Sequence, residues 1–333
     1  MGRERRTTIA DVARAAGTTA PTVSKVLSGR SDVSAAMRAR VMRAVADLGY
    51  RGRAGKRLLR PAMVELVMSG VEGEWANRAL SGVESAAAEA GVALVVSVAD
   101  RDGAWLPRLL DRGLGGAVLA LVDATGAQLA TLEAAGVRVV LLDPVTQPPA
   151  SVASVGATNW TGGRAAAEHL ISLGHERLAV VGGRRGHLYS QARIDGFRSA
   201  ADEAGVPLPD SSVVHSDWRR SGAARSAAGL LDRDDPPTAV FACSDTMAFG
   251  VVDAAESSGL RVPEEVSVVG FDDLPQGQWL RPALTTVRQP IREMGAAALR
   301  MLLRVMAEPP GAPPREELAT SLVERASTAA PRQ

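Results

Sequence analysis

One stretch near the start, TIADVARAAGTTAPTVSKVLSG at residues 8–29, limits the fold of this chain more tightly than any other. Thr8 is a good N-cap residue, and apolar residues follow it at helical spacing. Gly17 then supplies a tight turn before Thr19, a second N-cap residue that opens another helical pattern. A third pattern of this kind covers residues 34–49. Three short helices, the first two joined by a glycine turn, predict a helix-turn-helix.

The charge of the chain is divided unevenly along its length. The whole chain carries +1, but residues 1–60 hold 14 Lys and Arg against four acidic residues, a net charge of +10. Residues 61–333 hold the other 24 basic and 33 acidic residues, a net charge of −9. A patterned basic segment on an acidic body is typical of a nucleic-acid-binding domain joined to a domain with another role. We therefore predict that the helix-turn-helix binds double-stranded DNA.

The second helix of this head is expected to read the DNA. Val23, Val26 and Leu27 share its apolar face, so its opposite face is expected to enter a major groove. We expect base contacts from Ala20, Pro21 and Lys25, phosphate contacts from Thr19, Thr22 and Ser24, and further DNA contacts from Thr8 and Ser28.

The residues T-I-A-D-V-A-R-A-A-G and T-V-S-K-V-L-S-G, followed by V-S and L-G-Y, resemble the LacI/GalR family of bacterial transcriptional regulators. The resemblance implies that Ala20, Pro21 and Lys25 lie against operator bases. It also implies a homodimer whose two heads bind successive major grooves of a pseudo-palindromic operator.

The linker at residues 51–61 departs from the pattern of that family. Family members begin a hinge helix with Pro-Asn, whereas this chain has Gly52 and Arg53, and Lys56 replaces an alanine. Leu59 keeps the position of the leucine that wedges between base pairs in the minor groove. Because each glycine weakens a helix by about 1 kcal/mol, we expect this segment to become helical only on DNA. The DNA contacts expected from it are those of Arg53, Lys56, Arg57 and Leu59.

From residue 62 onward, apolar β-rich runs alternate with amphipathic stretches. Continuous apolar strands separated by helices indicate parallel sheets that are covered on both faces. Eight or more such units fit two doubly wound lobes better than one. The predicted strands cover residues 64–68, 92–98, 117–122, 137–142, 177–182, 212–216, 238–243 and 266–271.

Tryptophans indicate where a ligand binds in this body. Ligands of doubly wound sheets bind beyond the carboxyl ends of the strands, and Trp75, Trp160, Trp218 and Trp279 each follow an apolar run. Flat aromatic rings suit the C–H faces of sugars. Each ring could instead belong to a core or to the interface between lobes, but that explanation is less favoured for all four together.

The resemblance extends into the body through R-I-D-G-F, S-D-T-M-A-F-G, V-P-E-E-V-S-V-V-G-F-D-D and L-T-T-V-R-Q-P, which look like the periplasmic-binding-protein-like effector domain of the family. It implies that Arg193 grips ligand oxygens, Trp218 stacks on the ligand and Asp272 accepts its hydroxyl donors. It also implies polar contacts from Ser244 and Asp245, where the family often has Asn-Asp. The predicted ligand-binding set is Trp75, Trp160, Arg193, Trp218, Ser244, Asp245, Asp272 and Gln289, the last near a crossover between lobes.

The expected organisation combines a small all-α head with an α/β body of two doubly wound parallel-sheet lobes. The head covers residues 1–50, the linker 51–61 and the body 62–327, and residues 328–333 are expected to form a loose tail. Lobe 1 is expected at about 62–160 and 288–316, and lobe 2 at about 161–287 and 317–327.

The sequence lacks the patterns of a catalytic or metal site. The loop VVGGRRG does not have the G-x-G-x-x-G spacing, and neither a phosphate loop nor a G-x-S-x-G elbow occurs. His169 and His175 are expected at the surface or at helix ends, and Cys243 as a buried apolar residue. We therefore predict no enzyme, no cofactor and no metal, and no apolar run is long enough to span a membrane.

The sequence thus predicts a cytoplasmic, nucleoid-associated repressor of carbohydrate-utilisation genes, released by a sugar bound between the lobes. Two alternatives stay open. One is a corepressed regulator whose ligand, such as a purine, tightens DNA binding, and the other is a solute-binding protein without a regulatory role. The patterned basic head, and first residues that do not resemble a secretory signal, count against the second.

Overall fold

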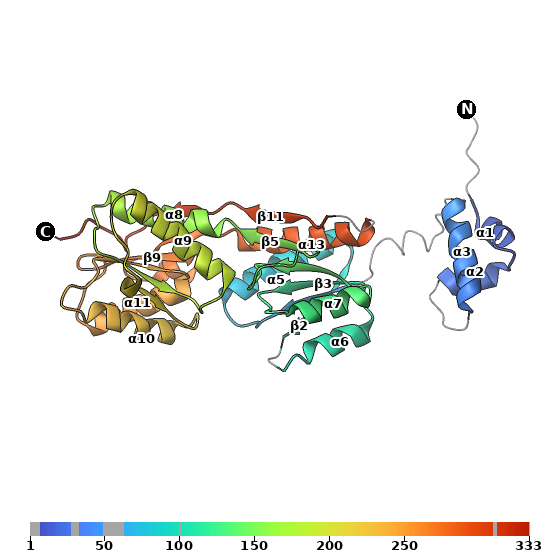
Figure 1. The fold of residues 1–333 in the computed structure, drawn as a ribbon, viewed down its shortest axis with the longest axis horizontal. Helices are drawn as coiled ribbons and strands as arrows, with labels where there is room; N and C mark the ends of the chain where they lie inside the picture. Colours follow the sequence, from blue (N-terminus) through green and yellow to red (C-terminus); the bar gives the residue numbers. More distant parts are fainter. Residues whose placement is uncertain (1–6, 28–32, 49–62, 100–101, 309–311, 333) are drawn as a thin grey trace, which may run out of the picture. The chain divides into compact units, whose positions relative to one another are not determined.

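The computed structural model describes residues 7–27, 33–48, 63–99, 102–308 and 312–332 (Figure 1). These belong to two compact units, Met1–Met63 and Val64–Gln333. The predicted DNA contacts of the linker, and Ser28, lie outside the described residues. None of the described helices is long and apolar enough to cross a membrane.

The head consists of the three predicted helices, α1 (Ile9–Ala15), α2 (Ala20–Leu27) and α3 (Ala35–Asp47). Val12, Val23 and Val41, one from each helix, are fully buried and form its small core. Arg40 of α3 donates to the carbonyl oxygen of Ala16 at 2.7 Å and so fixes the turn between α1 and α2. The structure confirms the predicted helix-turn-helix.

Lobe 1 of the body contains a six-stranded sheet in the order β11-β5-β4-β3-β1-β2. Helices α5 (Glu74–Ala90) and α13 (Ile291–Ala307) pack over one apolar core, and α6 (Trp105–Arg112) and α7 (Gly126–Ala134) over the other. The strands are β1 (Met63–Met68), β2 (Ala93–Val98), β3 (Gly116–Ala120), β4 (Arg138–Leu142), β5 (Ala153–Ala157) and β11 (Arg315–Leu318).

Lobe 2 contains a second six-stranded sheet, in the order β12-β10-β9-β8-β6-β7. The β10–β12 pair is antiparallel, and the other described pairs of this sheet are parallel. Its strands are β6 (Leu178–Gly182), β7 (Val213–His215), β8 (Ala239–Ala242), β9 (Ser267–Asp272), β10 (Thr285–Arg288) and β12 (Ser321–Val323). Its helices are α8 (Asn159–Ser172), α9 (Leu188–Glu203), α10 (Arg220–Leu231), α11 (Asp245–Ser257) and α12 (Gln276–Trp279), with a 3-10 turn at Asp210–Ser212.

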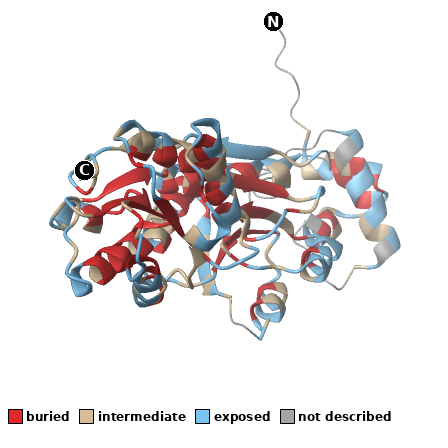
Figure 2. Ribbon diagram, turned by 60° about the vertical axis from the view of Figure 1, so that its left-hand side comes forward, coloured by how far each residue is buried: buried red, intermediate tan, exposed pale blue. Residues whose placement is uncertain are grey.

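The predicted fold class is confirmed, because the body has two mostly parallel six-stranded sheets packed with helices, with buried residues, red in Figure 2, on the central strands. All eight predicted strands are present, each within two residues of its expected bounds. The apolar run before Trp160 is also a strand, β5, and the strands that the apolar pattern did not identify are β10, β11 and β12. These are short, and β11 has the sequence REEL with three exposed side chains, so it carries no apolar signal.

The chain passes between the lobes three times, after β5, after β10 and after β11. Two of these crossovers are bonded to each other. The Thr158 amide donates to the Leu318 carbonyl oxygen at 2.9 Å, and the Thr320 amide donates to Thr158 Oγ1 at 2.9 Å. The lobes are therefore connected by three chain segments, two of which are hydrogen-bonded to each other.

The segment after β12 is bonded to lobe 2, and this includes the start of the expected loose tail at 328–333, where the Ala329 amide donates to Ser267 Oγ at 3.0 Å. Ser327 is buried, and its Oγ accepts from the Thr285 amide at 2.8 Å and donates to the Val268 carbonyl oxygen at 2.6 Å. His175, expected at the surface or at a helix end, lies just beyond the end of α8 but is buried, and it bonds the Ala329 carbonyl oxygen at 2.9 Å. Burial holds the pKa of His175 below its usual value. The tail lies in the lobe 2 core because its backbone groups find partners there.

Replacing Ser327 by alanine is expected to lower the free energy of unfolding by about 1–3 kcal/mol, because it leaves the buried Thr285 amide without an acceptor. Urea unfolding of the full chain measures this. Ser321, which is exposed on β12, is the matched control and should change the midpoint little when replaced by alanine. Equal effects of the two variants would contradict a structural role for the tail.

Candidate functional site

Arg193 of α9 is the centre of a polar group at the carboxyl ends of the strands. It is 2% exposed, and its Nε donates to Asn159 Oδ1 at 2.8 Å. Its Nη1 donates to the Cys243 carbonyl oxygen at 2.5 Å and lies 3.7 Å from Asp272 Oδ1. The guanidinium carbon lies 3.7 Å from the centre of the Phe271 ring. The cation is thus held rigidly in one orientation, ready to present its remaining N–H groups.

Two glycines allow α9 to bring Arg193 this close to α8. A Cβ on Gly163 would lie 2.0 Å from the Arg193 carbonyl oxygen, and one on Gly196 would lie 1.9 Å from that of Trp160. Any larger residue at either position would push the two helices apart. The close approach of α8 and α9 therefore depends on local sequence, and it sets the distance from Arg193 to Asn159 at the start of α8.

Two buried carboxyl groups lie near this cation. Burial raises the pKa of Asp143 to about 6 and that of Asp272 to about 7, while Arg193 opposes both shifts. Gln289 Nε2 donates to Asp272 Oδ1 at 3.1 Å. Among the described residues, Gln289 Oε1 is buried without a hydrogen-bond partner. An unsatisfied buried acceptor beside two carboxyl groups favours a ligand that supplies hydroxyl donors.

An aromatic group lies beside Arg193. Trp218 stacks on His187 with ring centres 6.0 Å apart and makes a tilted contact with Tyr189 at 5.1 Å. Arg193 lies over the Tyr189 ring at 5.6 Å. Trp218 Nε1 donates to His187 Nδ1 at 3.1 Å, which requires that nitrogen to be unprotonated. Burial also lowers the pKa of His187. The Trp218 ring rests against Gly183, where a Cβ would lie 1.9 Å from it, so its plane is fixed.

The backbone at these strand ends adopts left-handed conformations that non-glycine residues rarely take. The φ angles are 50° at Asp143, 68° at Trp218, 117° at Asp272 and 54° at Asp273, and Leu121 after β3 has 53°. Such strain persists only where the surroundings enforce it, and it concentrates at functional sites. The strained residues follow strands of both lobes, which supports a site between the two sheets.

The structure brings four of the predicted ligand residues together, namely Arg193, Trp218, Asp272 and Gln289. Their binding of a ligand stays a prediction. The sequence interpretation missed Asp143, Asn159, His187 and Tyr189 as members of the same group. Asp143 could have been found, because it directly follows the predicted strand 137–142. The other three had no such signal, since their positions depend on how α8 and α9 pack.

Ser244 and Asp245 have hydrogen-bond partners within the protein, and their binding of a ligand stays a prediction. Ser244 Oγ accepts from the Met247 amide at 3.2 Å and caps α11. Asp245 is fully buried, and its two oxygens accept from the Leu274 amide at 2.6 Å and from Thr286 Oγ1 at 2.5 Å. Burial raises the pKa of Asp245 well above its usual value. The strand end before these two residues borders the Arg193 group, because the Cys243 carbonyl oxygen accepts from Arg193.

The other predicted tryptophans have different surroundings, and their binding of a ligand stays a prediction. Trp75 packs against the lobe 1 core at the start of α5. Trp160 is 44% exposed with the guanidinium of Arg164 over its ring at 5.9 Å, and Trp279 is 70% exposed. All four tryptophans follow an apolar run. That position alone therefore did not distinguish Trp218, which packs beside Tyr189 and His187, from the others.

The DNA-facing candidates of the head lie on or beside α2 as predicted. Pro21, Ser24 and Lys25 are exposed, while Val23 and Val26 on the opposite face are buried. Ala20 and Thr22 are half-buried and Thr19 is exposed, with Thr19 and Thr22 hydroxyls 3.0 Å apart. Thr8 forms a capping box with Asp11, so its hydroxyl primarily stabilises α1. A helix with one buried and one exposed face suits insertion into a major groove.

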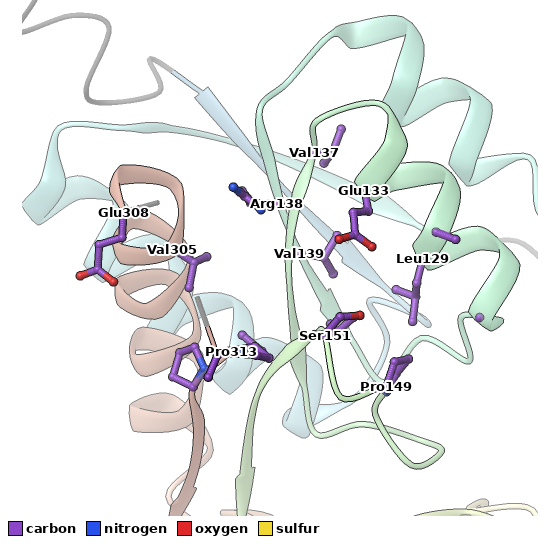
Figure 3. A pocket seen from close by; sticks show the side chains of 16 residues that line it. Leu129, Glu133, Val137, Arg138, Val139, Pro149, Ser151, Val305, Glu308 and Pro313 are labelled. Atoms are coloured by element: carbon purple, nitrogen blue, oxygen red, sulfur yellow. The ribbon is translucent and has the colours of Figure 1, made fainter. Parts of the chain in front are cut away.

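A hollow of about 260 Å³ on lobe 1 is separate from the Arg193 group (Figure 3). Leu129 and Glu133 of α7, Val305 near the end of α13 and the start of β4 line it. The hollow lies at the amino end of β4, whereas Asp143 follows the carboxyl end of that strand. The hollow therefore lies at the edge formed by the amino ends of the strands, whereas the candidate ligand site lies at the edge formed by their carboxyl ends.

The two carboxyl groups predict a specific pH dependence. Because the pKa of Asp272 is raised in the folded state, its ionisation at pH 8 destabilises the fold, and stability is regained as the pH falls through about 7. Asp272→Asn should remove the contribution of this ionisation to the free energy of unfolding. We expect the gain in unfolding free energy between pH 8 and pH 5.5 to be about 1–3 kcal/mol smaller in that variant.

Urea unfolding at the two pH values measures the difference, and the histidines, with lowered pKa values of their own, contribute equally to both proteins. An identical pH dependence in the two proteins would contradict a buried, ionising Asp272.

Comparisons with known proteins agree with this geometry. Residues 8–52 match the model described as bacterial regulatory proteins, lacI family, and residues 167–328 match a periplasmic binding protein-like domain. The transcriptional regulator CelR of Thermobifida fusca is 34% identical over 98% of this chain and 100% of its own length. The transcriptional regulator DegA of Bacillus subtilis is 31% identical over 87% of this chain and 89% of its own.

Solved structures resemble the chain along nearly its whole length. A transcriptional regulator CelR–cellobiose complex has a TM-score of 0.76 at 32% identity, covering 97% of this chain and 100% of the other. A lac repressor dimer bound to operator and the anti-inducer ONPF has a TM-score of 0.72 at 28% identity, covering 98% and 100%. Both the head and the two-lobed body therefore have structural counterparts.

Proposed function

The chain belongs to the LacI family of bacterial regulatory proteins and is a DNA-binding transcriptional regulator, and we propose that it represses carbohydrate-utilisation genes until a sugar binds between its lobes. The observation that supports a sugar as the ligand is the group of Arg193, Asp272 and Gln289 beside the Trp218 ring. A fixed cation and several acceptors suit hydroxyl groups, and the ring suits the apolar face of a pyranose. The cellobiose complex of the similar CelR supports this ligand class.

On the DNA side, we infer that two copies of the chain bind a pseudo-palindromic operator as a homodimer. A two-fold symmetric pair places two copies of α2 in successive major grooves. The similar lac repressor, solved as a dimer on its operator, supports this assembly. The chromosome is its target, so we infer that it acts in the cytoplasm at the nucleoid.

The proposed release follows from a preference for one arrangement of the lobes. Asp143 belongs to lobe 1 and Arg193 to lobe 2, so a ligand that bonds both favours the arrangement in which both reach it. A ligand shifts a conformational equilibrium only by its difference in affinity for the two states. Repression is relieved if the arrangement that the sugar favours is the one that binds operator more weakly.

A fluorescence titration tests the sugar proposal. The full chain is titrated with cellobiose and a panel of mono- and oligosaccharides, with purines as controls, and operator fragments selected in vitro are then used to measure release. We expect a saturable change in tryptophan fluorescence with one sugar, which disappears in Trp218→Phe and persists in Trp279→Phe. The exposed Trp279 provides the matched control because it lies apart from the Arg193 group.

Two results would contradict the proposal. A response to a purine that tightens operator binding would favour the corepressed regulator. Binding of a sugar without any change in operator affinity would favour a solute-binding role without regulation.

A further inference from the structure

The turn that follows β9 joins the candidate ligand site to the opposite lobe. Its first residue, Asp272, accepts from Gln289 and lies 3.7 Å from Arg193 Nη1. Two residues later, Leu274 is 4% exposed and belongs to the apolar core of lobe 1, together with side chains of α5 and α13. Leu274 follows a strand of lobe 2, yet its side chain is buried in lobe 1. Three consecutive residues therefore span the distance from the polar site to the neighbouring core.

The same turn is held firmly to lobe 2. Asp245 Oδ2 accepts from the Leu274 amide at 2.6 Å, and Asp245 Oδ1 accepts from Thr286 Oγ1 at 2.5 Å. Gly270 makes room for this carboxylate, since a Cβ there would lie 2.2 Å from Asp245 Oδ1. Two hydrogen bonds to one fully buried carboxyl group fix both partners relative to α11. Leu274 is thus carried by lobe 2 as a rigid projection.

Asp273, in the middle of the turn, contacts both lobes. Its carboxylate accepts from Arg288 Nε at 2.7 Å and from Arg325 Nη2 at 2.5 Å, both in lobe 2. Its carbonyl oxygen accepts from Arg78 Nη1 of α5, in lobe 1, at 3.1 Å. These ion pairs hold the pKa of Asp273 below its usual value. The turn therefore has polar as well as apolar contacts across the boundary between lobes.

We propose that the turn Asp272–Leu274 couples the ligand site to the angle between the lobes, with Leu274 as the anchor in lobe 1 and Asp245 as the positioning residue. Because the turn cannot move relative to lobe 2, a rotation of the lobes must pull Leu274 out of the lobe 1 core or drag α5 with it. A ligand bonded to Asp272 acts on the same three residues. The coupling to a ligand rests on the proposed function, whereas the anchoring does not.

A distance measurement between spin labels tests the anchoring in the full chain without any ligand. Labels are placed on cysteines introduced at Glu133 of lobe 1 and Asp202 of lobe 2, both exposed, while Cys243 is buried. We expect one narrow distance distribution in the parent. Leu274→Ala should shift the balance of lobe arrangements by at least about tenfold, seen as a second population. Asp245→Asn should do the same through the turn.

Controls separate anchoring from general destabilisation. Leu230→Ala truncates a fully buried leucine within the lobe 2 core and should leave the distribution narrow. Leu274→Met, which nearly conserves volume, should restore the parent distribution. Where the alanine variant does not fold, Leu274→Val provides the smaller truncation. An unchanged distribution in Leu274→Ala or Leu274→Val would overturn the proposal.

The second part of the experiment tests the coupling to a ligand, with cellobiose as the probe. In the parent it should narrow or move the distance distribution, and in Leu274→Ala its effect on operator affinity should fall by at least about tenfold. Full retention of that effect in a variant with altered lobe distances would refute the coupling. No response of the parent to cellobiose or any other sugar would count against the proposed function. The distances between the spin labels, measured without ligand, would still test whether Leu274 anchors the turn in lobe 1.

Discussion

Replacing Arg193 by alanine is expected to abolish the response to sugar while operator binding persists. The guanidinium is a buried cation, and its hydrogen bonds to Asn159 and Cys243 and its ion pair with Asp272 all disappear in the variant. Charge-assisted hydrogen bonds contribute about 1.5–3 kcal/mol each. Loss of two such bonds to a ligand corresponds to an increase of at least about 100-fold in its Kd. Titration of tryptophan fluorescence measures it.

The control for this variant is Arg193→Lys, which keeps the charge without the planar fork and should recover only part of the affinity. Removing the cation also leaves Asp143 and Asp272 with less compensation, so the body should lose about 3–5 kcal/mol of unfolding free energy at pH 8. The head is a separate compact unit and should keep its affinity for operator. Normal induction in a folded Arg193→Ala protein would refute the assignment of the site.

Replacing Lys25 by alanine is expected to relax base preference at one position of each half-site. Lys25 is exposed on α2, on the face opposite the buried Val23 and Val26. A specific contact to a base edge discriminates by about 1–3 kcal/mol against the wrong base. Binding to a set of single-base operator variants should therefore show up to about 100-fold loss on the preferred base and little change on the others.

Arg43, exposed on α3, is the matched cation for this experiment, since α3 is not the recognition helix. Arg43→Ala should change affinity equally on all operator variants or leave it unchanged. A uniform loss for Lys25→Ala, with the slope of log affinity against log salt reduced by about 1, would instead make Lys25 a phosphate contact.

Much of the candidate site could be predicted from the sequence. Arg193, Trp218, Asp272 and Gln289 were identified in advance from their match to a known family, and the structure brings them together. The surroundings of Asp245 were not predicted, because a carboxyl group after a strand can face either a ligand or the core. Only the positions of Leu274 and Thr286 settle which donors it meets.

The sequence by itself determined the local elements of this protein. Capping residues, a glycine turn and apolar periodicity are short-range signals, so they define the three head helices and eight strands without knowledge of the packing. Tertiary structure alone decided the rest. The burial of Ser327 and His175, the polar group around Arg193 and the insertion of Leu274 into lobe 1 all join residues far apart in the chain. Such contacts depend on how helices and sheets approach one another, and no local pattern records that distance.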